Sequence, residues 1–428
     1  MMDKKRIRLA SLDLANFRGF ESVNLTFEPQ LTVLIGNNGA GKTTILEAVA
    51  GSLQYIKDEI QEQQQQTELF KDTDIRTVSN IDSFELRLKL DEPDTELKAN
   101  YFRRHRTAFE YISGQSINTD GEPVDERDNE IQSLMKSWYA DNGSLEILAY
   151  YPCEAISVQN GSVTKFNPRN AQSAYDDVLN GRFNFSMLKK WLVYQFNIKQ
   201  EVGSNAYFDR IADIITGKNG ILNDEDDVHF SEMRVTYLRN EDTEGSLLFT
   251  KGDVGITEHQ LSSGEKLLFA LFADIARRLI TANPKSNDPL TEGSGVVLID
   301  EIDLHLHPKW QQKVVGSLLS IFPNVQFLVT SHSAEVLKGL DRKHIRILKN
   351  RQIISTAPFI KGRKSSAILE DVFEIPELTS EYEEKIKQFY RAVETDKITA
   401  RRLLDEIKMD FGEYDENVLR AESYFEIF

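Results

Sequence analysis

Cysteine is nearly absent from this chain of 428 residues, which contains only Cys153. A single cysteine excludes an internal disulfide and any zinc site built from several cysteines of one chain. A small residue in the core is the role that we expect for it. Long apolar runs are also missing, because no stretch reaches the roughly 18 to 20 apolar residues that span a bilayer. The first residues, MMDKKRIRLASL, lack the pattern of a signal peptide, so we expect a cytoplasmic protein without a membrane segment.

Basic residues are fewer than acidic ones: 51 Lys and Arg compare with 68 Asp and Glu, for a net charge of −17. Affinity for a phosphate backbone comes from Lys and Arg that release counterions, so the charge argues against a protein that coats DNA by bulk electrostatics. Any contact with DNA must be local or supplied by a partner. With 40% hydrophobic residues, the chain can still bury a large core in two or three lobes.

Apolar spacing predicts an α/β protein. The run LTVLI before Gly36 reads as a short buried strand, and the segment from Lys42 has helical spacing that continues to about Glu68. Alternation over residues 82–104 predicts antiparallel strands, whereas residues 171–216 have the spacing of helices. After the helix LLFALFADIARRLI, the strand VVLIDE, the helix KWQQKVVGSLLSIF and the strand VQFLVTSH form a βαβ-like pattern.

The stretch GNNGAGKTT lies between that first buried strand and its helix. It matches the pattern G-x-x-x-x-G-K-[ST], and its place after a strand and before a helix makes the match credible. The glycines let backbone N–H groups converge on phosphate oxygens, and the helix start adds partial positive charge. We expect Lys42 to bind the β- and γ-phosphates and Thr43, or less directly Thr44, to hold Mg²⁺. The other residues of this phosphate loop that we expect to bind nucleotide are Asn37, Asn38, Gly39, Ala40 and Gly41.

The strand VVLI ends in the acidic pair Asp300-Glu301. Such a pair fits one carboxylate in the Mg²⁺ shell and a second that orients or deprotonates the attacking water. We assign the first role to Asp300 and the second, catalytic one to Glu301. Taken alone, the pair is equally consistent with a strand that runs into a charged turn.

Between these two motifs lies LSSGEK, at the start of a predicted helix. A serine and a glycine at a helix N-terminus form an anion site from a hydroxyl and N–H groups, although an ordinary helix cap has the same residues. In its position between the phosphate loop and the acidic strand, the segment resembles the signature of the ABC-type ATPase superfamily, whose usual form is LSGGQ. Ser263 replaces the first glycine and Glu265 the glutamine, whereas Ser262 and Gly264 are kept.

This resemblance implies a composite active site. In the superfamily the signature of one subunit completes the site of another, so that two heads sandwich two ATP molecules and the signature contacts the γ-phosphate in trans. Asp303 matches the D-loop aspartate of the family, and His332 in LVTSHS matches its switch histidine near the γ-phosphate. His305 and His307 are alternatively metal ligands, since alternate residues of an extended segment face one side, but no third ligand is in view.

The N-terminal sequence LANFRGFESVNLTF resembles the opening of RecF, SMC and related DNA-repair ATPases. In that group an arginine at the position of Arg18 lies near the nucleotide. The interval from Lys42 to Ser262 lacks sustained heptads, which excludes a long-armed SMC protein. A single cysteine also excludes a CxxC zinc hook. Both absences favour a compact head with a short helical insertion.

Finer similarity is to the PtuA ATPases of Septu anti-phage systems and their relatives encoded beside some retrons. AYYPCEAIS resembles that group's Tyr-Tyr-Pro strand, although Ala155 stands where the group often has Arg, and YDDVLNGRFNFSMLKKWL resembles its helical insertion. The resemblance implies a subunit that regulates or scaffolds a separate HNH-type nuclease and contacts DNA through that partner. The alternatives are a RecF-like repair ATPase that binds DNA directly and an assembly scaffold whose ATP site is structural.

We therefore expect an α/β fold, namely an ABC-type P-loop ATPase head with a mixed sheet and an antiparallel N-terminal subdomain. Residues 1–160 form the half of the head with the phosphate loop, 161–228 the helical insertion, 229–360 the half with the signature, and 361–428 a helical C-terminal region. We expect ATP and Mg²⁺ as ligands and a homodimer or higher even-numbered oligomer. The helical tail is the expected docking or oligomerisation surface, although terminal amphipathic helices commonly just cover a core.

Overall fold

The computed structural model describes residues 7–60, 70–78, 81–91, 95–102, 105–113, 145–153, 166–168, 170–176, 179, 183–223, 229–237, 245–354, 358–373, 380–412 and 414–427. The chain divides into two compact units, Met1–Arg363 and Lys364–Phe428. Three sheets and their helices make up the described part of the first unit, and four helices make up that of the second. The division into segments at residues 160, 228 and 360 stays a prediction.

A six-stranded sheet forms the centre of the first unit, in the order β14-β13-β3-β12-β11-β7. Strands β7, β11, β12, β3 and β13 are parallel, and β14 pairs antiparallel to β13 at the edge. Every residue of β3, β7, β11 and β12 is buried, as continuous apolar runs predict for parallel strands covered on both faces. The strand bounds are β3 Leu31–Ile35, β7 Ile147–Tyr151, β11 Gly295–Ile299, β12 Val325–Ser331, β13 Ile345–Lys349 and β14 Gln352–Ile354.

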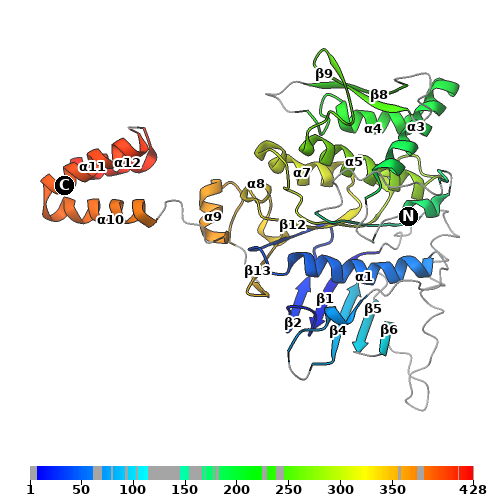
Figure 1. The fold of residues 1–428 in the computed structure, drawn as a ribbon, viewed down its shortest axis with the longest axis horizontal. Helices are drawn as coiled ribbons and strands as arrows, with labels where there is room; N and C mark the ends of the chain where they lie inside the picture. Colours follow the sequence, from blue (N-terminus) through cyan, green and yellow to red (C-terminus); the bar gives the residue numbers. More distant parts are fainter. Residues whose placement is uncertain are drawn as a thin grey trace. The chain divides into compact units, whose positions relative to one another are not determined.

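A five-stranded antiparallel sheet, in the order β2-β1-β4-β5-β6, lies across helix α1 (Lys42–Ile60) from the central sheet (Figure 1). Its strand β4 alternates between buried and less buried residues, which agrees with the period-2 pattern of the sequence. The predicted extension of α1 to Glu68 lies outside the described residues beyond Ile60. These strands are β1 Leu9–Ala15, β2 Ser22–Thr26, β4 Ser83–Leu90, β5 Thr95–Phe102 and β6 His105–Ser113.

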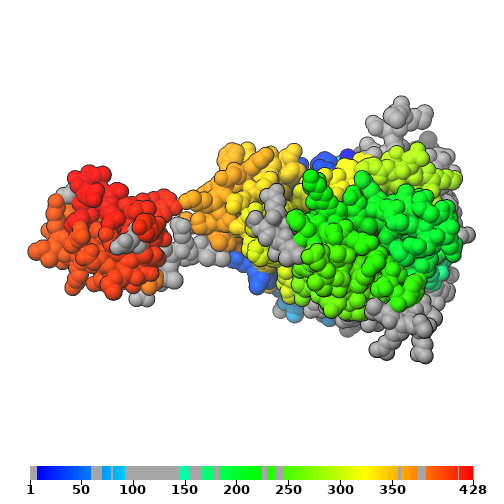
Figure 2. Space-filling view, turned by 90° about the horizontal axis from the view of Figure 1, so that it is seen from above, coloured from blue at the N-terminus to red at the C-terminus, as the bar shows by residue number. Residues whose placement is uncertain are grey.

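Helix α5 (Ser263–Ala282) is buried along almost its whole length and contacts β7, α3 and α4. Helices α3 (Phe185–Val202) and α4 (Ala206–Thr216), with a small antiparallel sheet, form an outer layer over α5, drawn in green in Figure 2. The strands of that sheet are β8 Phe230–Thr236, β9 Ser246–Lys251 and β10 Val254–Thr257. The remaining short elements of the first unit are η1 Asp72–Asp74, η2 Ala171–Tyr175, α6 Pro289–Glu292, α7 Pro308–Ile321, α8 Ala334–Leu337 and η3 Arg342–His344.

A buried ionic cluster stabilises α5 against β7. Asp274, 1% exposed, accepts hydrogen bonds from Arg277 and Arg278 on its own helix and from the Tyr151 hydroxyl. Burial by itself would raise the pKa of Asp274, but the two guanidinium groups lower it to about 2. A carboxylate held charged in the core in this way ties the helix that begins with the signature to the central sheet.

The second unit has its own apolar core. Helices α10, α11 and α12 pack together through Phe389, Leu404, Ile407 and Val418. Ile398 and Met409 are 85% and 88% exposed. The helices are α9 Ser365–Phe373, α10 Ser380–Thr395, α11 Lys397–Phe411 and α12 Glu416–Ile427. Whether this unit binds a partner stays a prediction.

The observed architecture confirms the predicted fold class, with a mixed central sheet and an antiparallel N-terminal subdomain. Both sheets are joined through the N-terminal 35 residues, because β1 and β2 enter the antiparallel sheet and β3 then enters the central one. Among the helices of the described ranges, none is both long and apolar enough for a membrane span.

Candidate nucleotide site

Four parallel strands of the central sheet end at one edge, and this edge gathers most of the predicted site residues. The register aligns Ile35 of β3 with Ser331 of β12 and Ile299 of β11 with Tyr151 of β7. The residues that follow these strands, from Gly36, Asp300, His332 and Pro152 onward, therefore come close together. Clefts at the carboxyl ends of parallel strands are where such sheets bind ligands.

The phosphate loop needs glycine at two positions for steric reasons. A Cβ on Gly36 would lie 2.2 Å from the carbonyl oxygen of Leu348, and one on Gly41 would lie 2.4 Å from the ring of Phe20. Gly39 has a φ of 76° and open space around it. Asn37, Asn38 and Gly39 are exposed, whereas Ala40 is buried. Both ends of the loop are therefore closely packed against neighbouring residues, and its middle is exposed to solvent.

Lys42 begins α1 and is only 6% exposed. Its Nζ donates hydrogen bonds to the carbonyl oxygens of Gly36 at 2.9 Å and Asn37 at 3.3 Å, so the side chain folds back along the phosphate loop. Burial lowers the pKa of Lys42, an effect opposed by the negative charges of Glu301, Asp300 and Asp303. The ammonium group therefore sits among the carboxylates at the strand edge.

Thr43 and Asp300, the two predicted Mg²⁺ ligands, meet directly. The Thr43 hydroxyl donates to Oδ2 of Asp300 at 2.8 Å, although the residues are 257 positions apart. Asp300 is 4% exposed and Thr43 is exposed, so the threonine side of the pair is accessible to solvent. A hydroxyl beside a carboxylate is an oxygen donor set of the kind that Mg²⁺ prefers. Thr44 is half-buried in the first turn of α1.

Thr330, which the sequence analysis missed, connects the two members of the acidic pair. Its hydroxyl donates to Oδ1 of Asp300 at 2.5 Å and accepts from the backbone N–H of Glu301 at 2.7 Å. Glu301 has a φ of 50°, a conformation that costs a residue with a Cβ some free energy. The buried hydroxyl of Thr330 holds that backbone in place. The sequence signal was its position just before Ser-His at the end of a strand adjacent to the acidic one.

The Glu301 carboxylate lies between two neighbours. The thiol of Cys153 lies 3.1 Å from its Oε2, and Nε2 of His332 lies 4.0 Å from its Oε1. Cys153 is half-buried, so its expected role as a small core residue needs correction. Cys153 follows β7, and only the pairing of β7 with β11 shows that it lies beside the acidic pair, so the sequence offered no local signal for it.

His332 follows β12 and contacts the predicted D-loop aspartate. Its backbone N–H donates to Oδ1 of Asp303 at 3.3 Å. Burial and the positive charge of Lys42 lower the pKa of the His332 imidazole, against the opposing charges of three carboxylates. A neutral imidazole at neutral pH can donate one N–H to a ligand.

Arg18 has its own partners inside the chain. It adopts a φ of 48° after β1 and donates hydrogen bonds to Glu47 on α1 and to Asp74, the latter at 2.7 Å. Burial by itself would lower the pKa of the Arg18 guanidinium, but these two carboxylates raise it above the ordinary value. The arginine therefore braces the phosphate-loop helix against residues 72–74, and its contact with nucleotide stays a prediction.

The signature residues form the N-terminus of α5. Ser262 caps the helix: its hydroxyl accepts from the N–H of Glu265, whose carboxylate accepts from the N–H of Ser262 at 2.7 Å. Glu265 also forms an ion pair with Lys251 at 2.7 Å. Burial opposes its charge, but the Lys251 and Ser262 hydrogen bonds lower the pKa of Glu265. Ser262 and Ser263 are exposed, so the capped end presents two hydroxyls to solvent.

Gly264 rests against the D-loop segment. A Cβ there would lie 2.6 Å from the carbonyl oxygen of His305, which itself has a φ of 61°. Within residues 7–60 and 245–354, no hydrogen bond or ion pair joins the signature to the phosphate loop. The structure therefore brings together the phosphate loop, the acidic pair and His332, whereas within these residues the signature has no hydrogen bond to the phosphate loop.

The alternative metal site at His305 and His307 has no third ligand among the described residues, where no cluster of three potential ligands occurs. His307 instead caps α7, with its Nδ1 accepting from the N–H of Lys309 at 3.5 Å. His305 is exposed in the turn before that helix.

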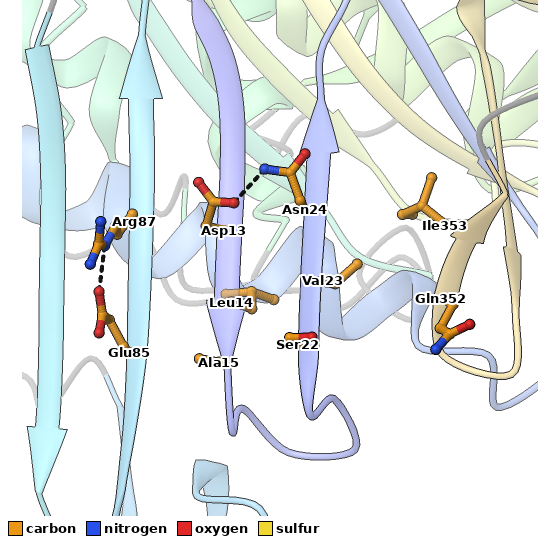
Figure 3. Close-up of a pocket in the computed structure, with 10 residues that line it drawn as sticks. All are labelled: Asp13, Leu14, Ala15, Ser22, Val23, Asn24, Glu85, Arg87, Gln352 and Ile353. Carbon is orange, nitrogen blue, oxygen red and sulfur yellow. Dashed lines mark hydrogen bonds and ion pairs between the residues drawn. The ribbon is translucent and has the colours of Figure 1, made fainter.

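A separate groove crosses β1, β2 and β4 beside the edge strand β14 (Figure 3). Four of its polar side chains form two pairs, since Asn24 donates to Asp13 and Arg87 pairs with Glu85. None of the predicted nucleotide-binding residues lines it.

Comparison with known proteins agrees with this geometry. Residues 31–338 match the family described as "AAA domain, putative AbiEii toxin, Type IV TA system". "Retron Ec83 probable ATPase" of Escherichia coli is 28% identical, with 97% of this chain and 86% of that protein covered. "Retron Vc95 probable ATPase" of Vibrio cholerae serotype O1 biovar El Tor is 28% identical, with 89% and 82% covered. "Septu protein PtuA" of Bacillus thuringiensis is 25% identical, with 90% and 89% covered. The chain therefore belongs to this AAA-domain family.

Proposed function

We propose that this chain binds and hydrolyses ATP with Mg²⁺, in sites completed by a second copy, as the ATPase subunit of an anti-phage defence complex. The observation that carries the hydrolytic part is the meeting of Lys42, Thr43, Asp300 and Glu301 at one strand edge. These groups come from two segments of the sequence more than 250 residues apart. Their convergence supports a nucleotide site over the alternative of an unrelated glycine-rich turn and a charged strand end.

Each side chain has a distinct task in this proposal. The loop N–H groups and Lys42 bind the β- and γ-phosphates, because both present positive charge to phosphate oxygens. Thr43 and Asp300 would hold Mg²⁺, which would supply positive charge next to the phosphates. Glu301 orients the attacking water and accepts its proton. His332, kept neutral by burial and by Lys42, donates an N–H to the γ-phosphate.

A second chain supplies the missing half of the site. Ser262 and Ser263 are exposed at the N-terminus of a long helix, where hydroxyls and N–H groups can bind a phosphate. Among the described residues, no hydrogen bond joins them to the chain's own phosphate loop at residues 36–44. A homodimer with two-fold symmetry would place each signature opposite its partner's phosphate loop and form two equivalent sites.

A mixing experiment tests the composite site. Lys42→Ala removes the phosphate-binding cation but keeps the signature, whereas Ser263→Glu keeps the phosphate loop and places a negative charge against the partner's phosphate. An acidic residue in the first turn suits a helix, so the second variant should fold. Each variant alone should be inactive, and an equimolar mixture should recover about a quarter of wild-type turnover through heterodimers with one intact site. An inactive mixture of variants that still dimerise would contradict a site shared between chains.

The defence assignment rests on relatives that align over most of this chain and are named as retron and Septu proteins. We propose a separate HNH-type nuclease as the partner, with DNA bound through that nuclease, since the net charge of −17 disfavours bulk DNA binding by this chain. Co-purification of the full chain with an HNH-type nuclease encoded in a neighbouring gene, and loss of phage protection with Lys42→Ala, would support this role. Salt-sensitive DNA binding by the isolated chain would instead favour a RecF-like repair protein.

A further inference from the structure

The position of Cys153 follows from strand pairing. Strands β7 and β11 are parallel, with Tyr151 opposite Ile299, and the N–H of Asp300 donates to the carbonyl oxygen of Tyr151 at 2.8 Å. Cys153 and Glu301 each lie two residues beyond this aligned pair. The sheet thus brings the thiol beside the carboxylate, although 148 residues separate them in sequence.

Glu301 has a fixed backbone and a less restrained side chain. Thr330 anchors its N–H, but its side chain is 32% exposed and has several rotatable bonds. The thiol of Cys153, 3.1 Å from Oε2, is its near neighbour on one side. His332 on the other side is 4.0 Å from Oε1, which is longer than a hydrogen bond.

We propose that Cys153 is a positioning residue for Glu301, and that its S–H donates to Oε2 and holds the carboxylate toward the nucleotide. A carboxylate with one oxygen bound to the thiol keeps the other oxygen available to accept a proton from water. This proposal rests on the proposed hydrolytic role of Glu301. If Cys153 has this role, the rate of ATP hydrolysis depends on the S–H donor of Cys153, whereas ATP binding does not.

Three substitutions separate the hydrogen bond from packing. Cys153→Ser keeps an O–H donor, Cys153→Val fills the space with a somewhat larger apolar group and no donor, and Cys153→Ala lacks both the donor and the volume. We expect kcat to fall about 3- to 10-fold in the Val and Ala variants, the range for one lost weak hydrogen bond. The Ser variant should recover most of the loss. The KM for ATP and the binding of ATP should change little in all three.

A second measurement does not depend on hydrolysis. Because Cys153 is the single cysteine of the chain, iodoacetamide alkylates the full-length protein at one thiol. In Glu301→Gln the neighbouring negative charge is gone, the thiolate becomes easier to form, and alkylation should be about 3- to 10-fold faster at a fixed pH. Glu21→Gln is the matched control, since Glu21 is 77% exposed and pairs with Arg76. That control should leave the alkylation rate unchanged.

The two measurements fail in different ways. If the wild type hydrolyses no ATP, the proposed function is wrong, while the alkylation rates still report whether Glu301 borders the thiol. Equal alkylation rates in wild type and Glu301→Gln would overturn the contact itself. A Val variant that matches wild type, or a Ser variant no better than Ala, would overturn the positioning role.

Discussion

The phosphate loop and the signature segment are held in place by different kinds of contact. Lys42 and Asp300 are 6% and 4% exposed. Lys42 donates to the carbonyl oxygen of Gly36 in its own loop, whereas Asp300 accepts from Thr43 and Thr330, which are 257 and 30 residues away. Ser262 and Ser263 are exposed, and the bonds of Ser262 lie within its own helix start. One half is therefore organised by long-range packing and the other by local capping. This difference agrees with a phosphate loop that acts within its own chain and a signature that is exposed to a second chain.

The largest expected effect comes from Glu301→Gln. An amide cannot accept the proton of the attacking water, so turnover should fall about 10²- to 10⁴-fold, the usual range for loss of a general base. ATP binding should persist, and ATP-bound dimers should accumulate. Phosphate release and light scattering with ATP measure the two outcomes. Unchanged turnover would remove Glu301 from the mechanism, and Glu21→Gln serves as the surface control.

Asp274→Ala tests how firmly α5, the helix that begins with the signature, is held in the fold. The substitution leaves Arg277 and Arg278 without their buried counter-ion, so the free energy of unfolding should fall by about 3 to 5 kcal/mol. Urea denaturation followed by circular dichroism measures this change. A loss under about 1 kcal/mol would show that the guanidinium groups find other partners.

The Asp274 carboxylate also makes the free energy of unfolding depend on pH. Because the pKa of Asp274 in the folded chain is about 2, below its ordinary value of 3.8, its contribution to stability is present above pH 3.8. That contribution is lost as the pH falls from 3.8 toward 2. The stability difference between wild type and Asp274→Ala should therefore shrink across this window. A constant difference would contradict the depressed pKa.

Lys42→Ala tests the phosphate-loop half alone. Loss of the buried ammonium group should weaken ATP binding about 100-fold, which is near the upper range for hydrogen bonds that involve a charged group. Titration calorimetry on the isolated chain measures the affinity. Lys218→Ala, at an exposed residue after α4, is the matched control and should bind ATP as the wild type does. Equal affinities in the two variants would place ATP elsewhere.

Ser262→Ala should have the smallest effect. Removal of the helix cap should cost about 1 kcal/mol of stability, and turnover should fall because the partner's phosphate loses a hydroxyl; ATP binding by the isolated chain should not change. Ser262→Asp keeps a capping oxygen but places a negative charge where we expect the partner's phosphate. It should therefore restore stability without restoring turnover. If Ser262→Asp recovered both stability and turnover, the serine would serve only as a helix cap. The exposed signature would then have no role at the partner's phosphate.

Much of the site was predictable from local sequence. The phosphate loop, the acidic pair and the histidine after β12 could be identified because each lies at the end of an apolar strand, where a short motif carries its own geometry. The capping box at Ser262 and Glu265 is equally local, since three residues separate its members. The burial of β3, β11 and β12 follows from their continuous apolar runs.

Other contacts were decided by the tertiary structure alone. The Cys153 thiol meets Glu301 across 148 residues, Thr330 reaches Asp300 across 30, and Arg18 is bound to Asp74 across 56. No local pattern encodes these pairs, because they depend on which strands are neighbours and in what register. The sequence by itself determined the groups that we expect to bind phosphate and the strands that precede them. The order of strands in the central sheet decided which side chains hold those groups in place, since only pairing between distant segments brings them within hydrogen-bonding distance.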